Sequence, residues 1–381
     1  MNTIVLGESH HNTLGLIRSL GEAGHKVFLI LKKKTYDFVD KSKYLTKTFY
    51  VDELEEVFSI IESIAAETKS KTALFAATEE FAEYEDKHYD DLEKFCFCEG
   101  GGKSNSLSGI RCKEAMNSLA EKCGLNVPKT FIVNSKDAIP DGIDYPVIVK
   151  SSYSVNGWKN AMKMCRSQEE LDEHISSLDN VFFPLLVQKY IKKDYEMLFL
   201  GCSINGGHEV ICPVGHRKIR FYPSEYSLGS YSRSFMTSSD MEVKALTEKV
   251  TTFLRQIAYT GLFSAEFVHC DGKYYFLEVN LRNDATSIIS TRCNFNLPDI
   301  LCKYYSSGEV NVPDAGSYRE RHYMHIVADI HHAVSGKINF VKWLGQLRNA
   351  GAYAYFDRKD IKPFVYYLTG IVKSKLRRKT S

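Results

Sequence analysis

Carboxylates and an amide that could bind a metal ion are concentrated in one short stretch, residues 266–282. Its pattern is typical of two β-strands joined by a tight Asp271-Gly272 turn. Glu266 belongs to the first strand, and Glu278 and Asn280 belong to the second. Carboxylate and amide oxygens are hard ligands of the kind that Mg²⁺ prefers. We therefore predict a magnesium site formed by these three residues, with an ordinary charged surface hairpin as the alternative.

The length of the loop decides whether these three side chains meet. A three-residue loop, with Gly272 in the left-handed conformation, places all three on one face of the ribbon. The opposite face is then apolar and turned to the core, with Ala265, Phe267, Tyr275, Leu277 and Val279. A two-residue loop would send Glu266 to the other face. The sequence favours the three-residue loop because only that loop keeps the cluster together.

The motif, with its spacing of 278 − 266 = 12 residues between the acids and its Glu-x-Asn-x-Arg ending, resembles the metal and substrate ribbon of the ATP-grasp superfamily. It is most similar to the carboxylate–amine ligases, such as D-aspartate ligase and the carbamoyl-phosphate synthase large chain. The resemblance extends from about residue 3 to about residue 310. It implies ATP and Mg²⁺ as cofactors, with two metal ions and with Mn²⁺ as an alternative.

The resemblance also implies a set of nucleotide-binding residues. Two lysines would contact phosphates; Lys150 is the stronger candidate because it ends an apolar strand, where a cation has little reason to pack. The loop after Lys150 would be a phosphate flap, although it contains only one glycine where the family has several. A short segment between the lobes would bind adenine through its backbone, and an acid beyond it would bind ribose. The implied residues are Lys113, Lys150, Ser151, Asn156, Gly157, Gln188, Lys189, Tyr190, Ile191, and Asp194 or Glu196.

Three further cations are predicted to act on the reacting groups. Lys218 and Arg220 alternate along a strand, so both would point to one face and could meet a phosphoryl group during its transfer. The alternative is an exposed basic edge strand. Arg282 would orient the substrate carboxylate, because a guanidinium binds a carboxylate with two parallel hydrogen bonds.

The elements that must position these residues follow from the pattern of apolar residues. Strands near residues 3–7 and 24–31 flank a helix, which predicts a parallel βαβ unit, and 71–77 adds another strand. The first loop, residues 7–13, is not a G-x-G-x-x-G loop, so the dinucleotide fingerprint is absent. His10 and His11 in this loop are interpreted as surface residues. Glu79 and Glu80 follow the strand over 71–77 and could hold a substrate ammonium.

The predicted fold class is α/β and α+β, an ATP-grasp fold preceded by a small Rossmann-like parallel α/β domain. We predict four parts: an N-terminal domain over residues 1–105, a small lobe with the flap over 106–185, a large lobe with the metal and substrate site over 186–310, and a largely helical extension with a basic tail over 311–381. The polar, glycine-rich stretch 99–108 is interpreted as a linker.

Composition limits the partners. A net charge of +2 gives no reason to expect nucleic acid as a partner. Ten scattered cysteines without a C-x-x-C pair, and a polar N-terminus, predict reduced thiols in a cytoplasmic protein. No apolar run is long enough for a membrane span, and we do not expect the basic C-terminal tail to anchor the chain to a membrane.

We thus predict an ATP-dependent carboxylate–amine ligase that forms an amide through an acyl-phosphate and releases ADP and phosphate. Its partners would be a small carboxylate and an amine, and it could form a homodimer. Two alternatives use the same nucleotide site: an ATP-grasp kinase that phosphorylates a small molecule, and a non-catalytic ATP-binding protein.

Overall fold

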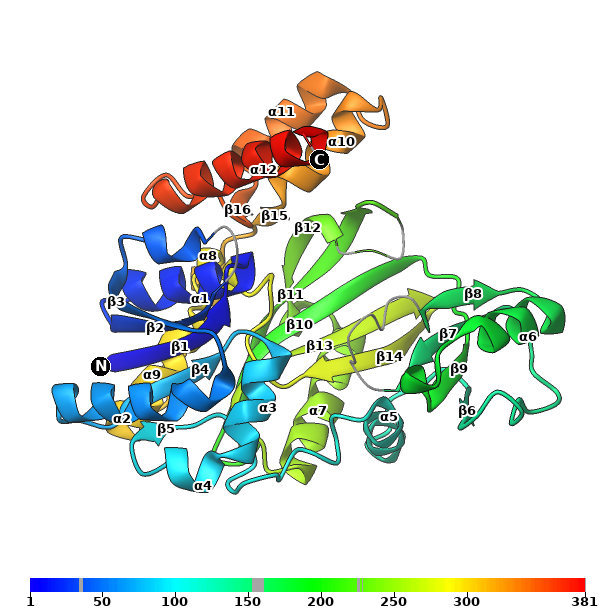
Figure 1. The fold of residues 1–381 in the computed structure, drawn as a ribbon, viewed down its shortest axis with the longest axis horizontal. Coiled ribbons are helices and arrows are strands. Elements are labelled where there is room, and N and C mark those ends of the chain that lie inside the picture. Colours follow the sequence, from blue (N-terminus) through cyan, green and yellow to red (C-terminus); the bar gives the residue numbers. More distant parts are fainter. Residues whose placement is uncertain (34–36, 153–160, 225–226, 228, 381) are drawn as a thin grey trace. The chain divides into compact units, whose positions relative to one another are not determined.

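The computed structural model describes residues 1–33, 37–152, 161–224, 227 and 229–380 (Figure 1). They form two compact units. The first unit comprises residues 1–106, 198–264 and 280–381, and the second comprises 107–197 and 265–279. The chain therefore passes between the units several times. The predicted division into four consecutive parts remains a prediction.

The first unit begins with a parallel sheet, as the sequence predicts. The strand order β3-β2-β1-β4-β5 places the two strands of the predicted βαβ unit side by side, in register from Asn2↔Lys26 to Glu8↔Lys32. The central strands are buried on both faces, which is why they read as continuous apolar runs. The elements are β1 (Asn2–Glu8), α1 (His11–Glu22), β2 (Lys26–Lys32), β3 (Leu45–Val51), α2 (Val57–Thr68), β4 (Thr72–Ala76), α3 (Glu79–Lys87), α4 (Tyr89–Leu92) and β5 (Cys96–Phe97).

A second, mainly antiparallel sheet has the order β14-β13-β10-β11-β12-β15-β16. Its last two strands come from the C-terminal extension, so this extension is not purely helical. The strands are β10 (Tyr195–Ile204), β11 (Glu209–Phe221), β12 (Gly229–Met236), β13 (Gly261–Cys270), β14 (Lys273–Asn280), β15 (His322–Met324) and β16 (Gly351–Tyr353). The helices of this part are α7 (Met241–Gln256), α8 (Ile288–Arg292), α9 (Leu297–Ser307), α10 (Ile326–Val334), α11 (Phe340–Asn349) and α12 (Lys362–Thr380).

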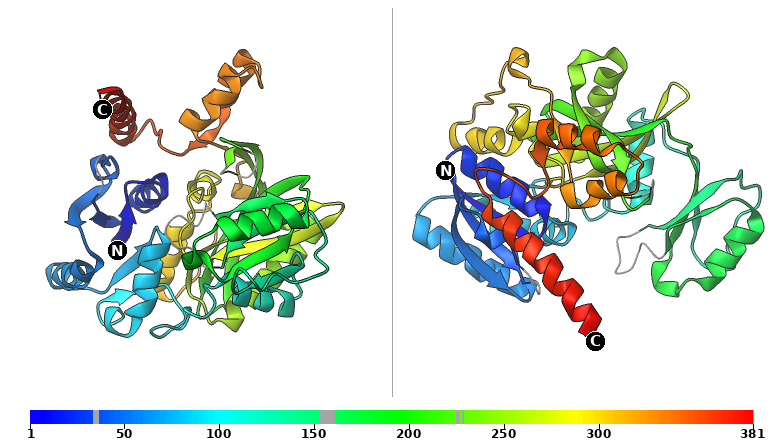
Figure 2. Two further views of the ribbon diagram at one scale, coloured as in Figure 1. Left: turned by 45° about the vertical axis from the view of Figure 1, so that its right-hand side comes forward. Right: turned by 90° about the horizontal axis from the view of Figure 1, so that it is seen from above.

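The second unit contains a four-stranded antiparallel sheet in the order β6-β9-β7-β8. Helix α6 covers one face of it (Figures 1 and 2), and its Leu171 and Ile175 share a core with Val147 and Val149 of β7. This packing holds β7, whose last residues include Lys150. The elements are α5 (Lys113–Lys122), β6 (Thr130–Val133), β7 (Val147–Ser151), β8 (Lys163–Cys165), α6 (Gln168–Ser177) and β9 (Leu185–Lys189).

The turn between β13 and β14 differs from the prediction. Asp271 has φ 48° and Gly272 has φ 72°, and the strands end directly at this pair, so the loop has two residues and not three. Positive φ at both positions matches the twist of the flanking strands, and this explains why Asp-Gly favours the two-residue loop. The ring of Phe267 accordingly packs against Phe276, which is buried, and not against Tyr275.

The stretch 99–108 is also not a simple linker. Glu99 is buried and accepts hydrogen bonds from the backbone N–H groups of Ala76 (3.1 Å) and Leu262 (2.6 Å). Gly100 pairs with Thr260 in an isolated bridge. A carboxylate that accepts two backbone N–H groups fixes this segment within the first unit, and burial raises the pKa of Glu99 to about 8.

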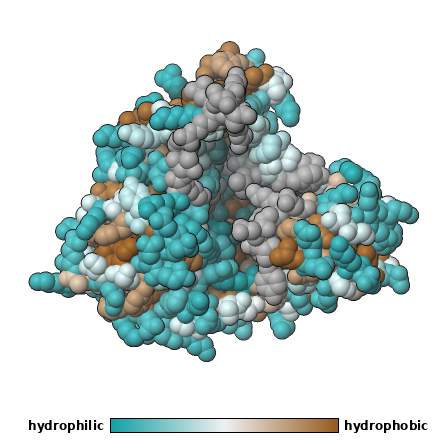
Figure 3. All heavy atoms as spheres, viewed as in Figure 1, coloured by the Kyte–Doolittle hydropathy of each residue, from teal (hydrophilic) through white to brown (hydrophobic). Residues whose placement is uncertain are grey.

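The C-terminal helices carry exposed apolar side chains, visible as the brown region at the top of Figure 3. They include Val334, Phe340, Val341 and Leu344. Within the residues that the structure describes, we find no helix with the length and apolar character needed to cross a membrane.

Candidate nucleotide and substrate site

Lys150, in the second unit, is a half-buried cation whose hydrogen-bond partner is an amide and not a carboxylate. It lies near the end of β7, and its Nζ donates to Oε1 of Gln188 on β9 at 3.0 Å. The pKa of Lys150 is lowered to about 8, chiefly by burial and also by the nearby Lys113, whereas Glu278 opposes the shift. An amide is a weak partner for a half-buried ammonium, so this site is suited to bind an anion.

Three predicted site residues are thus close neighbours within the second unit: Lys113, Lys150 and Glu278. Lys113 begins α5, and its backbone N–H donates to the carbonyl of Ser152 at 3.3 Å, which ties the helix to the end of β7. Ser151 is buried. Asn156 and Gly157 of the predicted flap lie outside the described residues.

The segment 188–191, predicted to bind adenine, begins with the last two residues of β9 and extends two residues past its end. Gln188 is buried between Lys150 and Thr130, and its Nε2 donates to Thr130 Oγ1 at 2.9 Å. The backbone N–H of Tyr190 donates to the carbonyl of Pro146 at 2.9 Å. The Nζ of Lys189 is occupied by the Asp144 carboxylate at 2.7 Å. Because the backbone N–H of Lys189 also donates, to the carbonyl of Lys129 at 2.8 Å, any adenine contact would use other backbone groups of this segment.

The two acids proposed for ribose are in different environments. Asp194 accepts from the ring of His269 at 2.9 Å and from the backbone N–H of Asp271 at 3.2 Å, so it fastens the β13–β14 hairpin. Glu196 lies on β10 and pairs with Lys193 at 2.6 Å. The bonds of Asp194 to the hairpin give it a structural role. Glu196 is therefore the better candidate for the acid that binds ribose.

Arg282 is held in place within the first unit. Its Nε donates to Glu79 at 3.0 Å, and its Nη2 donates to Oδ1 of Asn280 at 3.3 Å. The amide Nδ2 of Asn280 in turn donates to Ser264 Oγ at 3.3 Å. Glu79 and Glu80, considered as partners of a substrate ammonium, are instead paired with Arg282 and Lys32.

Asp284 extends this network, although the sequence did not identify it as a site residue. It accepts from the backbone N–H of Thr286 at 2.7 Å and from its hydroxyl. Burial alone would raise the pKa of Asp284, but these hydrogen bonds, with Arg282 and His216 nearby, lower it. The usable signal was the Asp-x-Thr spacing, which is typical of a carboxylate that caps its own turn.

His216 on β11 lies on the other side of Thr286. Its Nε2 is 2.8 Å from the Thr286 hydroxyl, and its buried Nδ1 has no hydrogen-bond partner within the described parts of the chain. The pKa of His216 is lowered to about 4, chiefly by burial; Asp284 opposes this shift, and the nearby Lys218 contributes to it. Lys218, from the predicted basic strand, therefore lies near the neutral imidazole of this network.

Lys218 and Arg220 do not share a face, which corrects the prediction. Lys218 pairs with Ser232, whereas Arg220 pairs with the adjacent Tyr231, and the register shifts between them. This irregularity inserts Ile219 as an extra residue, so the two side chains point to opposite faces of β11. Strict alternation fails wherever such a bulge occurs, and no local sequence pattern indicates one here.

Arg220 has a structural set of partners. Its Nε and Nη2 donate to both carboxylate oxygens of Asp329, at 2.9 and 2.6 Å, and its Nη1 donates to Gln346 at 2.9 Å. Its guanidinium also lies 4.1 Å from the ring centre of Tyr231. Asp329 is fully buried on α10. Arg220 therefore joins β11 to the C-terminal helices, and this argues against the catalytic role predicted for it.

The interpretation of His10 and His11 as residues of a surface loop is wrong for His11. His11 begins α1, is buried, and lies 3.2 Å from the hydroxyl of Tyr355. Burial lowers its pKa well below the usual value. The loop that ends β1 is thus packed against the C-terminal extension, and Asn12 links it to Asn283.

Known proteins share both sequence and fold with this chain. The family model of the ATP-grasp domain matches residues 118–294. The carbamoyl phosphate synthase large chain of Saccharolobus solfataricus is 24% identical over 281 residues, which is 72% of this chain and 26% of that protein. That of Pyrococcus furiosus is 27% identical over 225 residues, or 58% of this chain and 20% of that one. The chain thus spans about a quarter or less of the length of these relatives.

Solved structures show the same fold at low identity. The L-amino acid ligase of Bacillus licheniformis superposes with a TM-score of 0.63 at 14% identity, over 84% of this chain and 79% of that one. N5-carboxyaminoimidazole ribonucleotide synthetase of Thermus thermophilus gives 0.64 at 12%, over 84% and 82%. Biotin carboxylase of Campylobacter jejuni gives 0.64 at 16%, over 84% and 74%.

The fold of the protein follows from these matches. The chain has the ATP-grasp fold, and residues 118–294 match the ATP-grasp domain, as the Glu-x-Asn-x-Arg ribbon predicts. A small parallel α/β domain precedes this domain, also as predicted.

Proposed function

We propose that this protein is an ATP-dependent carboxylate–amine ligase that forms an amide through an acyl-phosphate and releases ADP and phosphate. The observation that carries the proposal is the environment of Lys150. A half-buried ammonium that has an amide as its hydrogen-bond partner and a second lysine nearby is stabilised when an anion arrives. The phosphates of ATP are such an anion, and Lys113 and Lys150 would bind them.

The metal set Glu266, Glu278 and Asn280 fits the chemistry of Mg²⁺, which is usually held by one or two carboxylates together with substrate phosphates. The described residues contain no group of three His, Cys, Asp or Glu that could bind a metal without such help. When bound, the ion would neutralise charge on the phosphates. We propose two ions, which Mn²⁺ could replace.

The two-residue turn by itself would separate Glu266 from the other two ligands, but a β-bulge would bring them back together. His269 packs against Tyr274 near the turn, and continuing this register places Ser264 on the face opposite Asn280. Yet Asn280 donates to Ser264. One extra residue on β14 would shift the register so that Asn280 and Ser264 lie on the same face, as their hydrogen bond requires. We place it at Leu277, because Leu277 and Glu278 are consecutive half-buried residues, and Glu278 then lies opposite Glu266.

Residues of the first unit would serve the carboxylate substrate. Arg282, fixed by Glu79, would orient it, and Lys218 would neutralise charge that develops on the transferred phosphoryl group. The carboxylate oxygen attacks the γ-phosphorus and ADP leaves; an amine then attacks the acyl carbon and phosphate leaves. No protein nucleophile is needed. The acceptor is an amine of the kind found in amino acids and amino sugars.

The test is ADP release from Mg-ATP with pooled amino acids and carboxylated sugars, run with and without hydroxylamine. We expect ADP release that depends on substrate, and a hydroxamate when hydroxylamine is present. ADP without hydroxamate would instead indicate a kinase. Glu278→Gln should reduce ADP release about 100-fold or more, since removal of one group that stabilises transition-state charge has effects of that size. Wild-type ADP release by this variant would refute the metal assignment.

A further inference from the structure

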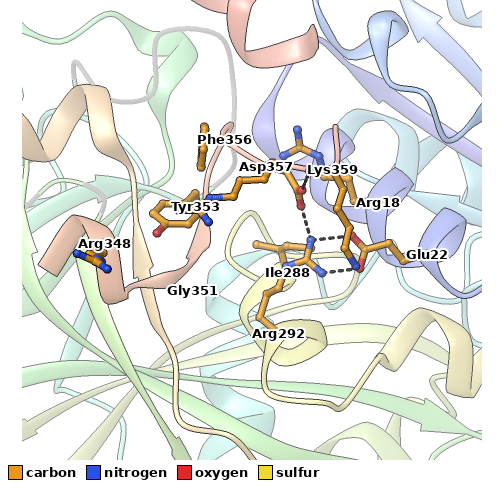
Figure 4. Close-up of a pocket in the computed structure, with 11 residues that line it drawn as sticks. Arg18, Glu22, Ile288, Arg292, Arg348, Gly351, Tyr353, Phe356, Asp357 and Lys359 are labelled. Atoms are coloured by element: carbon orange, nitrogen blue, oxygen red, sulfur yellow. Dashed lines mark hydrogen bonds and ion pairs between the residues drawn. The ribbon is translucent and has the colours of Figure 1, made fainter. Parts of the chain in front are cut away.

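A cavity of about 370 Å³ in the first unit is lined by an excess of cations. It lies between α1, α8 and the loop that follows β16 (Figure 4). Five lining side chains are cationic and two are carboxylates: Arg18, Arg292, Arg348, Arg358 and Lys359 against Glu22 and Asp357. The volume is in the range of small-molecule sites.

Two of the cations are built into the structure. Arg292 donates to Glu22 at 2.5 and 2.9 Å and to Asp357 at 2.6 Å, as the dashed lines in Figure 4 show. Arg18 is 1% exposed, and its Nε donates to Asp360 at 3.0 Å. Its Nη2 donates to the carbonyls of Tyr355 and Asp360. Nη1 of Arg18 donates to none of the described residues, so a buried guanidinium that lines the cavity retains an unused donor.

The other three cations form a rim with no counter-charge among the described residues. Arg348 ends α11, and Arg358 and Lys359 follow in the loop after β16. None of these side chains makes an ion pair with another described residue. The rim therefore adds three positive charges to an interior in which the carboxylates of Glu22, Asp357 and Asp360 already pair with the buried Arg18 and the half-buried Arg292.

Two aromatic rings complete the cavity. Tyr353 and Phe356 pack edge to face with ring centres 5.4 Å apart, and the Tyr353 hydroxyl donates to the Leu347 carbonyl at 2.6 Å. Ile288 adds apolar surface. A ligand that contacts both the rim and these rings needs a charged group next to a flat apolar part.

We propose that this cavity binds a small ligand with a doubly negative group beside a flat ring, as in an aromatic phosphate monoester or a dicarboxylate. Guanidinium groups bind both anions with paired hydrogen bonds. Three uncompensated cations exceed what a single carboxylate requires. The proposal concerns a site separate from the nucleotide-binding residues and does not depend on the ligase activity.

The test is isothermal titration calorimetry of the full chain with phenyl phosphate and, in a second arm, with phthalate. We expect saturable binding of at least one probe, and the stronger one identifies the anion class. The rim variant Arg348→Ala/Arg358→Ala/Lys359→Ala should bind about tenfold more weakly or worse, the loss expected when charged hydrogen bonds are removed. Because the three residues are exposed, thermal unfolding of this variant should match the wild type.

The matched control removes three exposed lysines that do not line the cavity, in the variant Lys244→Ala/Lys337→Ala/Lys342→Ala. It should bind the probes within about twofold of the wild type, because none of these lysines lines the cavity and exposed charges are screened by salt. Lys150→Met should also keep probe binding. Absence of binding to the wild type, equal loss in the control and rim variants, or loss in Lys150→Met would each overturn the proposal.

Discussion

Two basic strand segments, β7 with Lys150 and β11 with Arg220, look alike in the sequence and differ in the structure. Each places a cation on a strand where apolar side chains would be expected. Lys150 has an amide as its hydrogen-bond partner and lies near another cation. Arg220 has two carboxylate oxygens, an amide oxygen and an aromatic ring.

The difference distinguishes Lys150, which has no counter-charge as a hydrogen-bond partner and is suited to bind an anionic ligand, from Arg220, whose charge is already paired within the chain. A buried charge is tolerated when it is paired and hydrogen-bonded, and Arg220 meets this condition within the chain. Lys150 has no such pairing. Its lowered pKa reflects the free-energy cost of keeping its ammonium charged in that environment. Partners, which the sequence does not reveal, distinguish the two roles.

The largest effect is expected at the satisfied cation. Asp329 accepts from Arg220, from Ser230 at 2.7 Å and from Trp343 Nε1 at 3.0 Å, all within a buried site. Asp329→Ala should lower the free energy of unfolding by about 3–5 kcal/mol, because it leaves Arg220 without its counter-charge. Chemical denaturation measures this loss.

Glu320→Ala is the matched control for that variant, because it breaks the exposed pair with Arg233. It should change the free energy of unfolding by less than about 1 kcal/mol. If both variants lost the same small amount, Arg220 would not be a structural residue.

A smaller effect is expected at Lys218, on the other face of β11. Lys218→Met should reduce ADP release about 10- to 100-fold and leave the unfolding temperature nearly unchanged, because the lysine acts on charge that develops during the reaction. Steady-state kinetics should place the loss mainly in kcat. Arg217→Ala, an exposed neighbour, is the control, and an equal loss in both variants would remove Lys218 from the proposed site.

The smallest effect is a dependence on pH. The pKa of Lys150 is about 8 in the folded chain, against 10.5 for an ordinary lysine. Below pH 8 the folded protein carries the unfavourable buried charge, whereas between pH 8 and 10.5 only the unfolded chain keeps the proton, so this cost fades as pH rises. Lys150→Met should therefore be more thermally stable than the wild type at about pH 7, and the gap should narrow toward about pH 10. If the difference in unfolding temperature between Lys150→Met and the wild type did not change with pH, the pKa of Lys150 would not be lowered.

Much of the fold was predictable because it depends on local patterns. The apolar runs of β1, β2 and β4 and the Glu-x-Asn-x-Arg ribbon identified the parallel domain and the ATP-grasp domain. The errors arose where one residue changes a register. The Asp271-Gly272 turn has two residues, and the extra residue Ile219 rotates Arg220 to the other face.

The site was only partly predictable for a related reason. Lys113, Lys150 and Glu278 were named from the family pattern and do lie near one another. Asp284 was missed although its bonds to Thr286 are local, whereas His216 was missed because its contact with Thr286 joins β11 to the loop before α8, 70 residues further along the chain. The partner of Arg220 lies 109 residues away, a separation that no local pattern encodes.

The most direct test of the central claim is the affinity of Mg-ATP for the wild type, Lys150→Met and Arg220→Met, measured by isothermal titration calorimetry on folded protein. We predict that Lys150→Met binds Mg-ATP at least about tenfold more weakly, as expected for the loss of a charged hydrogen bond to phosphate. Arg220→Met should bind like the wild type, whatever it loses in stability. Wild-type affinity in Lys150→Met, or a loss confined to Arg220→Met, would contradict the assignment of the two cations.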